Sequence, residues 1–281
     1  GLDDLEALGL QPSDLTGLFK TVSKYPELDL YTDPPRTPPD LDETVEQGKE
    51  FVRMWQTYRP ENPPKDRDSA QEALDTAEGL LENLELNSPA RKARFLATLE
   101  KGYSSSSAKG KVTLSAWGNR GSESYEAARD LRDDAYQNLM DAVLPVLRKW
   151  RAHVHDRAID FVKPAAKRYL KTRREEGLLT HHDILYYTRN LLLENPEEVR
   201  REVYERTPRL LVDEFQDTDP LQAEILFYLT SENRQEKDWR SCTPRPGSLF
   251  IVGDDKQSIY RFRRADLNVY NEVTGRVKEA G

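Results

Sequence analysis

The sequence predicts a mainly helical chain whose C-terminal part changes to α/β structure. Within residues 130–175, apolar side chains recur every three or four positions, which is the spacing of one face of a helix. After Pro208 the pattern changes to two short apolar runs, residues 210–212 and 249–252, which both lead to acidic residues. Buried parallel strands that end at a binding site have this pattern. We therefore expect helices first and a small parallel sheet last.

The composition excludes several classes of protein. The 281 residues include 42 basic and 50 acidic side chains, and the resulting net charge of -8 excludes a uniformly basic nucleic-acid coat. Hydrophobic residues make up 37% of the chain, which is enough to bury a core, so disorder throughout is excluded as well. No apolar run approaches the roughly 18 residues that are needed to cross a bilayer.

Cysteine and histidine offer little for a metal centre. The single cysteine, Cys242, excludes an internal disulfide and a Cys-rich metal cluster, and it indicates a cytoplasmic chain. The four histidines have no partners that would make a metal site, and we expect surface or packing roles for them. They are His153, His155, His181 and His182.

The charge is unevenly distributed along the chain. Residues 1–50 hold 4 basic and 12 acidic side chains and account for the whole net charge, so the remainder is neutral in sum. Within that remainder, residues 146–176 hold ten Lys or Arg against four acidic residues, and residues 256–264 hold four basic residues and no acid. The stretch 146–176 is either a contact for duplex phosphates, with salt-dependent affinity, or the solvated face of a long helix.

The part before about Thr207 is expected to be helical, with proline-rich connectors near residues 33–39 and 60–64 and a surface loop at 104–110. The apolar stripe predicts one long helix or two helices in line within residues 130–175, with Pro145 and Pro164 as kinks or joints. The stripe consists of Leu139, Val143, Val146, Trp150, Val154, Ala158, Phe161, Ala165 and Tyr169.

Capping signals mark the helices that follow. Thr180 with Asp183 resembles a capping box that opens an amphipathic helix. Asn195 is expected to cap a further helix whose first turn contains Pro196. Residues 218–220 are expected to start the helix that connects the two strands.

Two segments carry a family resemblance. LLVDEFQDTDPLQ, residues 210–222, and LFIVGDDKQSIYRFRRAD, residues 249–266, resemble the second and third conserved motifs of superfamily 1 DNA helicases of the UvrD/Rep type. The forms DEFQDTDPLQ and IYRFRRAD are more similar to the RecB/AddA helicase-nuclease branch. The resemblance implies that residues 208–281 are part of the first RecA-like motor domain, a P-loop NTPase fold with a partial α/β sheet. Residues 1–207 would then form a helical accessory subdomain inserted in that domain.

The acidic strand end suits ATP hydrolysis. Asp213 is placed to hold Mg²⁺ through its water shell, and Glu214 to orient or deprotonate the attacking water. An isolated Asp-Glu pair would equally be a solvated strand end, and only the full motif favours the catalytic interpretation. By resemblance, Gln257 senses the γ-phosphate of ATP, and Gln216 and Asp217 link this segment to neighbouring motifs.

The second motif ends in alternating aromatic and basic residues that suit single-stranded DNA. Tyr260 and Phe262 would stack on bases while Arg263 and Arg264 hold phosphates. Phe262 stands where UvrD-type proteins usually carry a tryptophan, and a phenylalanine stacks with less ring area. Alternatively, the two aromatic residues belong to a core and the arginines to a solvated face.

A phosphate-binding loop of the form G-x-x-x-x-G-K-[ST] does not occur in the sequence. The resemblance therefore implies an internal fragment of an ATP-dependent DNA helicase that uses Mg²⁺ and ATP and moves 3′ to 5′ on single-stranded or forked DNA. The fragment itself is expected to lack ATPase activity. A second helicase-nuclease subunit is a candidate partner. The alternatives are a non-catalytic DNA-binding or protein-docking module with degenerate motifs, and a purely structural helical adaptor.

Overall fold

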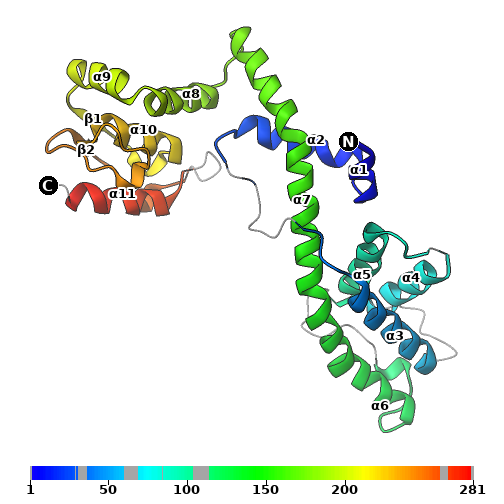
Figure 1. The fold of residues 1–281 in the computed structure, drawn as a ribbon. Coiled ribbons are helices and arrows are strands. Elements are labelled where there is room, and N and C mark those ends of the chain that lie inside the picture. The colour runs from blue at the N-terminus through cyan, green and yellow to red at the C-terminus, as the bar shows by residue number, and fades with distance from the viewer. Residues whose placement is uncertain are drawn as a thin grey trace. The chain divides into compact units, whose positions relative to one another are not determined.

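The computed structural model describes residues 2–28, 30, 37–59, 69–83, 85–103, 114–259 and 265–279. The chain divides into two compact units (Figure 1). The first unit comprises Gly1–Ser23 and Leu28–Arg168, and the second comprises Lys24–Glu27 and Tyr169–Gly281. Each unit is described below by itself.

The elements of the first unit are helical. They are α1 (Leu2–Ala7), α2 (Pro12–Lys24), α3 (Asp42–Tyr58), α4 (Ser69–Asn83), α5 (Pro89–Tyr103), a 3-10 turn (Leu114–Ala116), α6 (Glu123–Asp130), a π-helical turn (Leu131–Ala135) and α7 (Tyr136–Glu175). The last residue of α2 and the last turns of α7 belong to the second unit.

The main core of the first unit lies between α3, α4, α5 and the first half of α7. Trp55 and Phe95 are among its fully buried side chains, and the hydroxyl of Tyr136 donates to the Leu99 carbonyl at 2.7 Å. Gly48 lets α3 and α5 approach closely, because a Cβ there would lie 2.8 Å from the Phe95 ring. A second, smaller cluster joins α1 and α2 to the later part of α7.

Helix α7 is continuous through both of its prolines, so the prediction of one long helix is confirmed over residues 136–175. Pro145 and Pro164 do not end the helix. Both lie on its exposed side, where water can hydrogen-bond the carbonyl that a proline leaves without a donor.

The predicted apolar stripe of α7 is correct only up to Ala158. Beyond it Phe161, Ala165 and Tyr169 are exposed, and the buried positions are instead Ile159, Val162, Ala166 and Leu170. The reason is that the early part of α7 packs on the α3–α5 core whereas residues 158–166 pack on α1 and α2. The helix turns a different face to each partner.

The second unit contains helices around a two-stranded sheet. Its elements are α8 (His181–Glu194), a π-helical turn (Pro196–Arg200), α9 (Arg201–Arg206), β1 (Leu210–Val212), a 3-10 turn (Phe215–Asp217), α10 (Pro220–Thr230), a 3-10 turn (Trp239–Ser241), β2 (Leu249–Ile251), a 3-10 turn (Asp255–Gln257) and α11 (Leu267–Glu279). The strands pair in parallel, with Leu210 opposite Leu249 and Val212 opposite Ile251. The predicted strand–helix–strand order is confirmed.

The strands are buried on one face only, which corrects the expectation of buried strands. Leu249 is 8% exposed, but Leu211 and Phe250, which pair directly and point to the other face, are 72% and 63% exposed. The core of the unit, which includes Phe227 and Trp239, covers the first face and leaves the second uncovered by described residues.

The capping predictions are confirmed at two helices and wrong at a third. Thr180 and Asp183 form a full capping box at α8, and Asp219 and Gln222 form another at α10. Asn195, however, makes no side-chain cap. Its own N–H closes α8 on the Leu191 carbonyl, so the residue ends one helix instead of opening the next.

Several predictions fall on residues without a described structure. Pro34, Pro35, the second proline cluster and the loop at 104–110 lie outside the described residues. Among the helices that are described, none combines the length and apolarity that a membrane span requires.

Candidate nucleotide site at the strand ends

The two strands leave the sheet side by side, which brings the loops after them together. Val252 N–H donates to the Val212 carbonyl at 2.8 Å, and Phe215 N–H donates to the Val252 carbonyl at 3.0 Å. Asp213 and Glu214 follow β1 directly, and both are exposed. The first of the predicted catalytic positions is therefore open to solvent at the carboxyl edge of the sheet.

Glu214 has a left-handed backbone, with φ 52° and ψ 40°, and is the one non-glycine residue with positive φ in the described part of the chain. This conformation costs a residue with a Cβ about 1–2 kcal/mol. It turns the chain sharply, so that Phe215 enters the core while the next side chain lies against the second loop. Asp213 supports the turn, because its Oδ1 accepts the Glu214 N–H at 2.9 Å.

Gln216 joins the two strand-end loops. Its Nε2 donates to Glu214 Oε2 at 2.6 Å, and its Oε1 accepts the Asp254 N–H at 3.0 Å. The side chain is 2% exposed, and its backbone carbonyl accepts the Ser258 hydroxyl at 3.2 Å. The resemblance implied that Gln216 contacts a neighbouring motif, and the geometry supplies two such contacts.

Asp217 is placed differently from its neighbour. Its N–H closes the 3-10 turn on the Glu214 carbonyl at 3.0 Å, and its Oδ1 is buried without a hydrogen bond to any described residue. The implied link of Asp217 to another motif stays a prediction.

Gln257 lies in the short turn after β2 and is exposed. Its Nε2 donates to Asp254 Oδ2 at 3.0 Å, while Asp254 Oδ1 accepts the Lys256 N–H at 3.0 Å. These two hydrogen bonds, the one from Gln257 first, hold the pKa of Asp254 below its ordinary value. Glu214, Gln216, Asp254 and Gln257 thus form one continuous chain of hydrogen bonds across the strand ends.

Two residues of this region were not singled out from the sequence. Gly253 allows the close approach of Gln216, because a Cβ would lie 2.6 Å from Gln216 Oε1. Tyr270 of α11 donates its hydroxyl to the Gly253 carbonyl at 3.0 Å. A glycine after a strand pattern is a signal of close backbone approach. No sequence signal identifies Tyr270.

Asp213 is the candidate magnesium ligand. Its Oδ2 has no partner among the described residues, and Mg²⁺ in nucleotide sites is bound by one or two carboxylates together with waters and phosphates. No group of three or more His, Cys, Asp or Glu suited to a metal occurs in the described residues. The donor set therefore fits a cation that arrives with a phosphate ligand better than one held by the protein alone.

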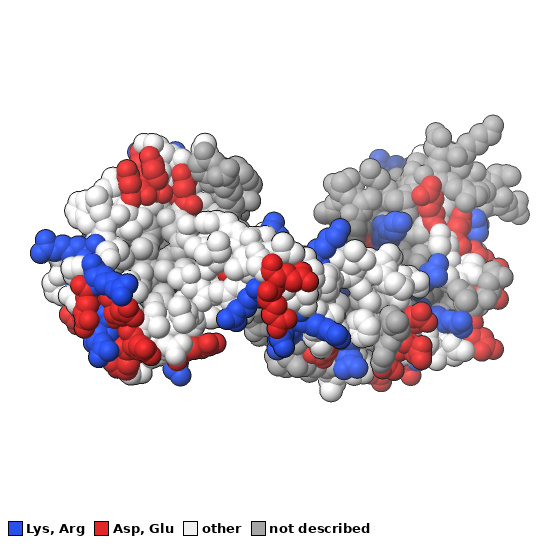
Figure 2. All heavy atoms as spheres, turned by 90° about the horizontal axis from the view of Figure 1, so that it is seen from above, with Lys and Arg blue, Asp and Glu red and all other residues white. Residues whose placement is uncertain are grey.

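The predicted DNA-binding residues Tyr260, Phe262, Arg263 and Arg264 lie outside the described residues. The basic stretch 146–176 is described and is partly neutralised. Arg151 pairs with Glu100 at 2.9 Å, and Arg173 pairs with Asp183. Arg148, Lys149, Lys167 and Arg168 are exposed and pair with no described residue. On the face drawn in Figure 2, basic and acidic side chains are interspersed. Both interpretations of the stretch therefore remain open.

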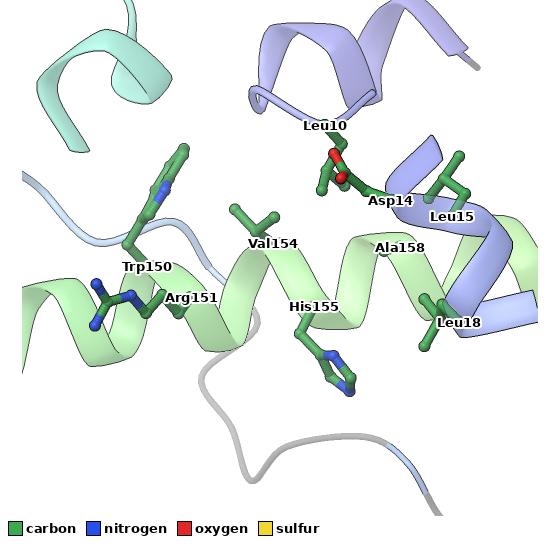
Figure 3. A pocket seen from close by; sticks show the side chains of 9 residues that line it. All are labelled: Leu10, Asp14, Leu15, Leu18, Trp150, Arg151, Val154, His155 and Ala158. Atoms are coloured by element: carbon green, nitrogen blue, oxygen red, sulfur yellow. The ribbon is translucent and has the colours of Figure 1, made fainter. Parts of the chain in front are cut away.

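A pocket of about 320 Å³ lies elsewhere, between α1, α2 and α7 of the first unit. Figure 3 shows Trp150 and Val154 pointing from α7 toward Leu10 and Asp14, while His155 points the other way. His155 Nε2 is 2.7 Å from the Leu30 carbonyl. The pocket contains none of the predicted site residues, and its lining is mostly apolar.

Comparison with known families gives the class of protein. The family described as UvrD/REP helicase N-terminal domain matches residues 49–278. The chain therefore belongs to the UvrD/REP helicase family, and the resemblance found in the two motifs is confirmed.

Individual relatives are similar over part of the chain. The larger-complex component named ATP-dependent helicase/nuclease subunit from Thermoanaerobacter sp. (strain X514) is 35% identical over 113 residues, 38% of this chain and 8% of that protein. The protein of the same name from Listeria innocua is 33% identical over 113 residues, 40% and 8% of the two chains. The exonuclease/helicase subunit RexA of Streptococcus pneumoniae serotype 4 is 36% identical over 112 residues, again 40% and 8%.

The chain thus spans about 8% of the length of these curated relatives. No solved structure matches it significantly.

Proposed function

We propose that this chain is part of an ATP-dependent DNA helicase or translocase and carries the strand-end residues of its ATP site. The observation that carries the proposal is the hydrogen-bond chain from Glu214 through Gln216 and Asp254 to Gln257. It connects, at one edge of a parallel sheet, a carboxylate suited to activate water and an amide suited to contact phosphate. Solvated strand ends without a function would not require a buried glutamine between them.

Each site residue has a defined part in this proposal. Bound Mg²⁺ would supply positive charge to the β- and γ-phosphates of ATP. Asp213 holds the waters of that ion with its free Oδ2. Glu214 orients or deprotonates the attacking water with the carboxylate whose other oxygen Gln216 holds. Gln257 contacts the γ-phosphate, with Asp254 fixing its amide.

The DNA side of the proposal begins three residues after Gln257. Tyr260 and Phe262 would stack on bases of single-stranded DNA, and Arg263 and Arg264 would hold its phosphates. The short separation along the chain makes this segment a coupling element between ATP and DNA. Stretch 146–176 is either a contact for the duplex of forked DNA or a solvated face.

The wider assignments follow the family. We propose that residues 208–281 belong to the first RecA-like motor domain, that residues 1–207 form an accessory subdomain inserted in it, and that movement is 3′ to 5′. The relatives are named as subunits of a helicase/nuclease, which supports a role in DNA repair or recombination together with a second, partner subunit. We place the protein in the cytoplasm.

The test compares two activities of the 281-residue chain. It should bind single-stranded DNA, more weakly at higher salt, and should show no ATPase activity above background, because it contains no phosphate-binding loop. DNA-stimulated ATP turnover by these residues that Glu214→Gln abolishes would overturn the assignment as an incomplete motor.

The absence of a phosphate-binding loop from these residues also suits the second candidate, a non-catalytic DNA-binding or docking module. The full open reading frame separates the two, since a G-x-x-x-x-G-K-[ST] loop ahead of these residues supports the motor and its absence supports the module. Unchanged DNA affinity in the double variant Tyr260→Ala/Phe262→Ala would instead indicate a structural adaptor.

A further inference from the structure

The peptide group between Gly253 and Asp254 is held at both polar ends by side chains from two other elements. Its carbonyl oxygen, on Gly253, accepts the hydroxyl of Tyr270 in α11 at 3.0 Å. Its N–H, on Asp254, donates to Gln216 Oε1 in the turn after β1, also at 3.0 Å. One peptide plane after β2 is therefore fixed from two sides.

Both holding side chains are themselves fixed. Gln216 is buried, and its Nε2 is bound to Glu214 at 2.6 Å. The ring of Tyr270 lies 6.0 Å from the ring of Phe215, with 37° between the planes, and Phe215 is 1% exposed. The Tyr270 hydroxyl is thus presented by a ring that packs on the core, which lowers the entropy cost of its hydrogen bond.

Glycine at position 253 explains why this peptide needs two hydrogen bonds. A side chain is prevented there, because a Cβ would lie 2.6 Å from Gln216 Oε1 and 3.2 Å from the Phe215 nitrogen. Glycine, however, permits rotations that other residues resist, so the peptide beside it turns over easily. The residue that lets Gln216 approach also removes the steric barrier to rotation, and the bond from Tyr270 supplies the missing restraint.

The orientation of this peptide is passed on to Gln257. Asp254 follows it directly and binds the turn through both carboxylate oxygens, Oδ1 to the Lys256 N–H and Oδ2 to Gln257 Nε2. If the plane rotated, the Asp254 carboxylate would move and Gln257 would lose the partner that directs its amide.

We propose that Tyr270 is a positioning residue, which fixes the Gly253–Asp254 peptide and thereby the direction of the Gln257 amide. The role of Gln257 toward phosphate rests on the proposed function, whereas the restraint on the peptide rests on the geometry alone. Tyr270 itself touches neither ATP nor DNA in this proposal, and it acts through Gly253 and Asp254.

Amide hydrogen exchange of the 281-residue chain tests the restraint. Tyr270→Phe keeps the ring and removes the donor, and loss of one ordinary hydrogen bond corresponds to about a fivefold change in an opening equilibrium. The Asp254 amide is expected to exchange faster by about that factor, while amides within α10 keep their rates. Unchanged exchange at Asp254 overturns the proposal.

Tyr228→Phe is the matched control. It removes the bond from the Tyr228 hydroxyl to the Lys237 carbonyl, 2.7 Å long, in the same unit and away from the strand ends. It should leave exchange at Asp254 as in the wild type. A faster Asp254 amide in both variants would show general loosening and would also overturn the proposal.

Kinetics of the full-length protein test the consequence for Gln257. Tyr270→Phe should lower kcat of DNA-stimulated ATP hydrolysis severalfold with KM for ATP unchanged, and Tyr228→Phe should change neither. Gln216→Met frees the other side of the same peptide and should give the same split if Tyr270→Phe fails to fold. An unchanged kcat overturns the positioning role. A wild-type protein without ATPase activity overturns the proposed function and this role with it, while exchange still judges the restraint.

Discussion

The guanidinium of Arg200 lies over the ring of Tyr228, with its Cζ 4.4 Å from the ring centroid. Arg200 is 1% exposed, its Nε donates to the Leu192 carbonyl at 2.8 Å, and its Nη1 donates to the Glu236 carbonyl at 2.9 Å. One side chain therefore joins α8, α10 and the loop after α10. Burial lowers the pKa of Arg200 from its ordinary value, but arginine stays protonated in proteins, so the second unit encloses a cation.

Arg200→Met is expected to destabilise the chain strongly. Two carbonyls lose a charged donor, and the expected loss is about 3 kcal/mol in the free energy of unfolding, measured by urea denaturation. Arg201→Met is the control, because Arg201 is exposed and pairs with Glu205 only at 3.8 Å. It should change stability by less than about 0.5 kcal/mol. Equal effects of the two substitutions would contradict the structural role of Arg200.

Tyr228 should make stability depend on alkaline pH. Burial raises its pKa from 10.0 to about 12, so the folded chain keeps a proton that the unfolded chain loses. The contribution is therefore complete below pH 10.0 and is lost as the pH rises toward 12. It amounts to about 2–3 kcal/mol. The difference in unfolding free energy between wild type and Tyr228→Phe, followed over this range, isolates the effect, and a difference that stays constant contradicts it.

Gly253→Ala should destabilise the chain and displace Gln216. The added Cβ would lie 2.6 Å from Gln216 Oε1 and within 3.3 Å of two backbone nitrogens, and such overpacking costs about 1–3 kcal/mol. Gly275→Ala in α11 is the control, because no atom lies within 4 Å of its new Cβ. That change should stabilise by up to about 1 kcal/mol. Urea denaturation should give opposite signs, and the same sign for both would show that position 253 is not crowded.

Glu214→Gly should separate stability from activity. Glycine adopts the left-handed backbone of this residue without the cost of about 1–2 kcal/mol that a Cβ brings. The variant should unfold at the same or a higher urea concentration than Glu214→Gln, although both should abolish ATP turnover in the full-length protein. A glycine variant less stable than the glutamine variant would mean that the hydrogen bond from Gln216 outweighs the backbone strain.

Local features of the fold could be predicted from the sequence. The Thr180–Asp183 capping box, the long helix and the strand–helix–strand order each depend on residues within a few positions of one another. The face change along α7 depends instead on which helices lie beside it, α3–α5 first and then α1 and α2. For the same reason the exposure of Leu211 and Phe250 was missed, because an apolar run does not tell how many faces are covered.

The site shows the same division. Asp213, Glu214 and Gln257 could be chosen from the two motifs, and the structure places Glu214 and Gln257 at the ends of one hydrogen-bond chain. The bond from Tyr270 to Gly253 joins residues 17 positions apart on different elements. Nothing in the residue types at that spacing specifies it, since it follows from where α11 packs.

The uncovered face of the sheet has a consequence for handling the isolated chain. Leu211 and Phe250 lie opposite each other and are largely exposed. Side chains without polar atoms adhere to one another by excluding water, and charge screening does not weaken that attraction. We therefore expect protein concentration and temperature, more than ionic strength, to decide whether this chain stays dispersed, and polar substitution at these two positions to be the first measure for keeping it so.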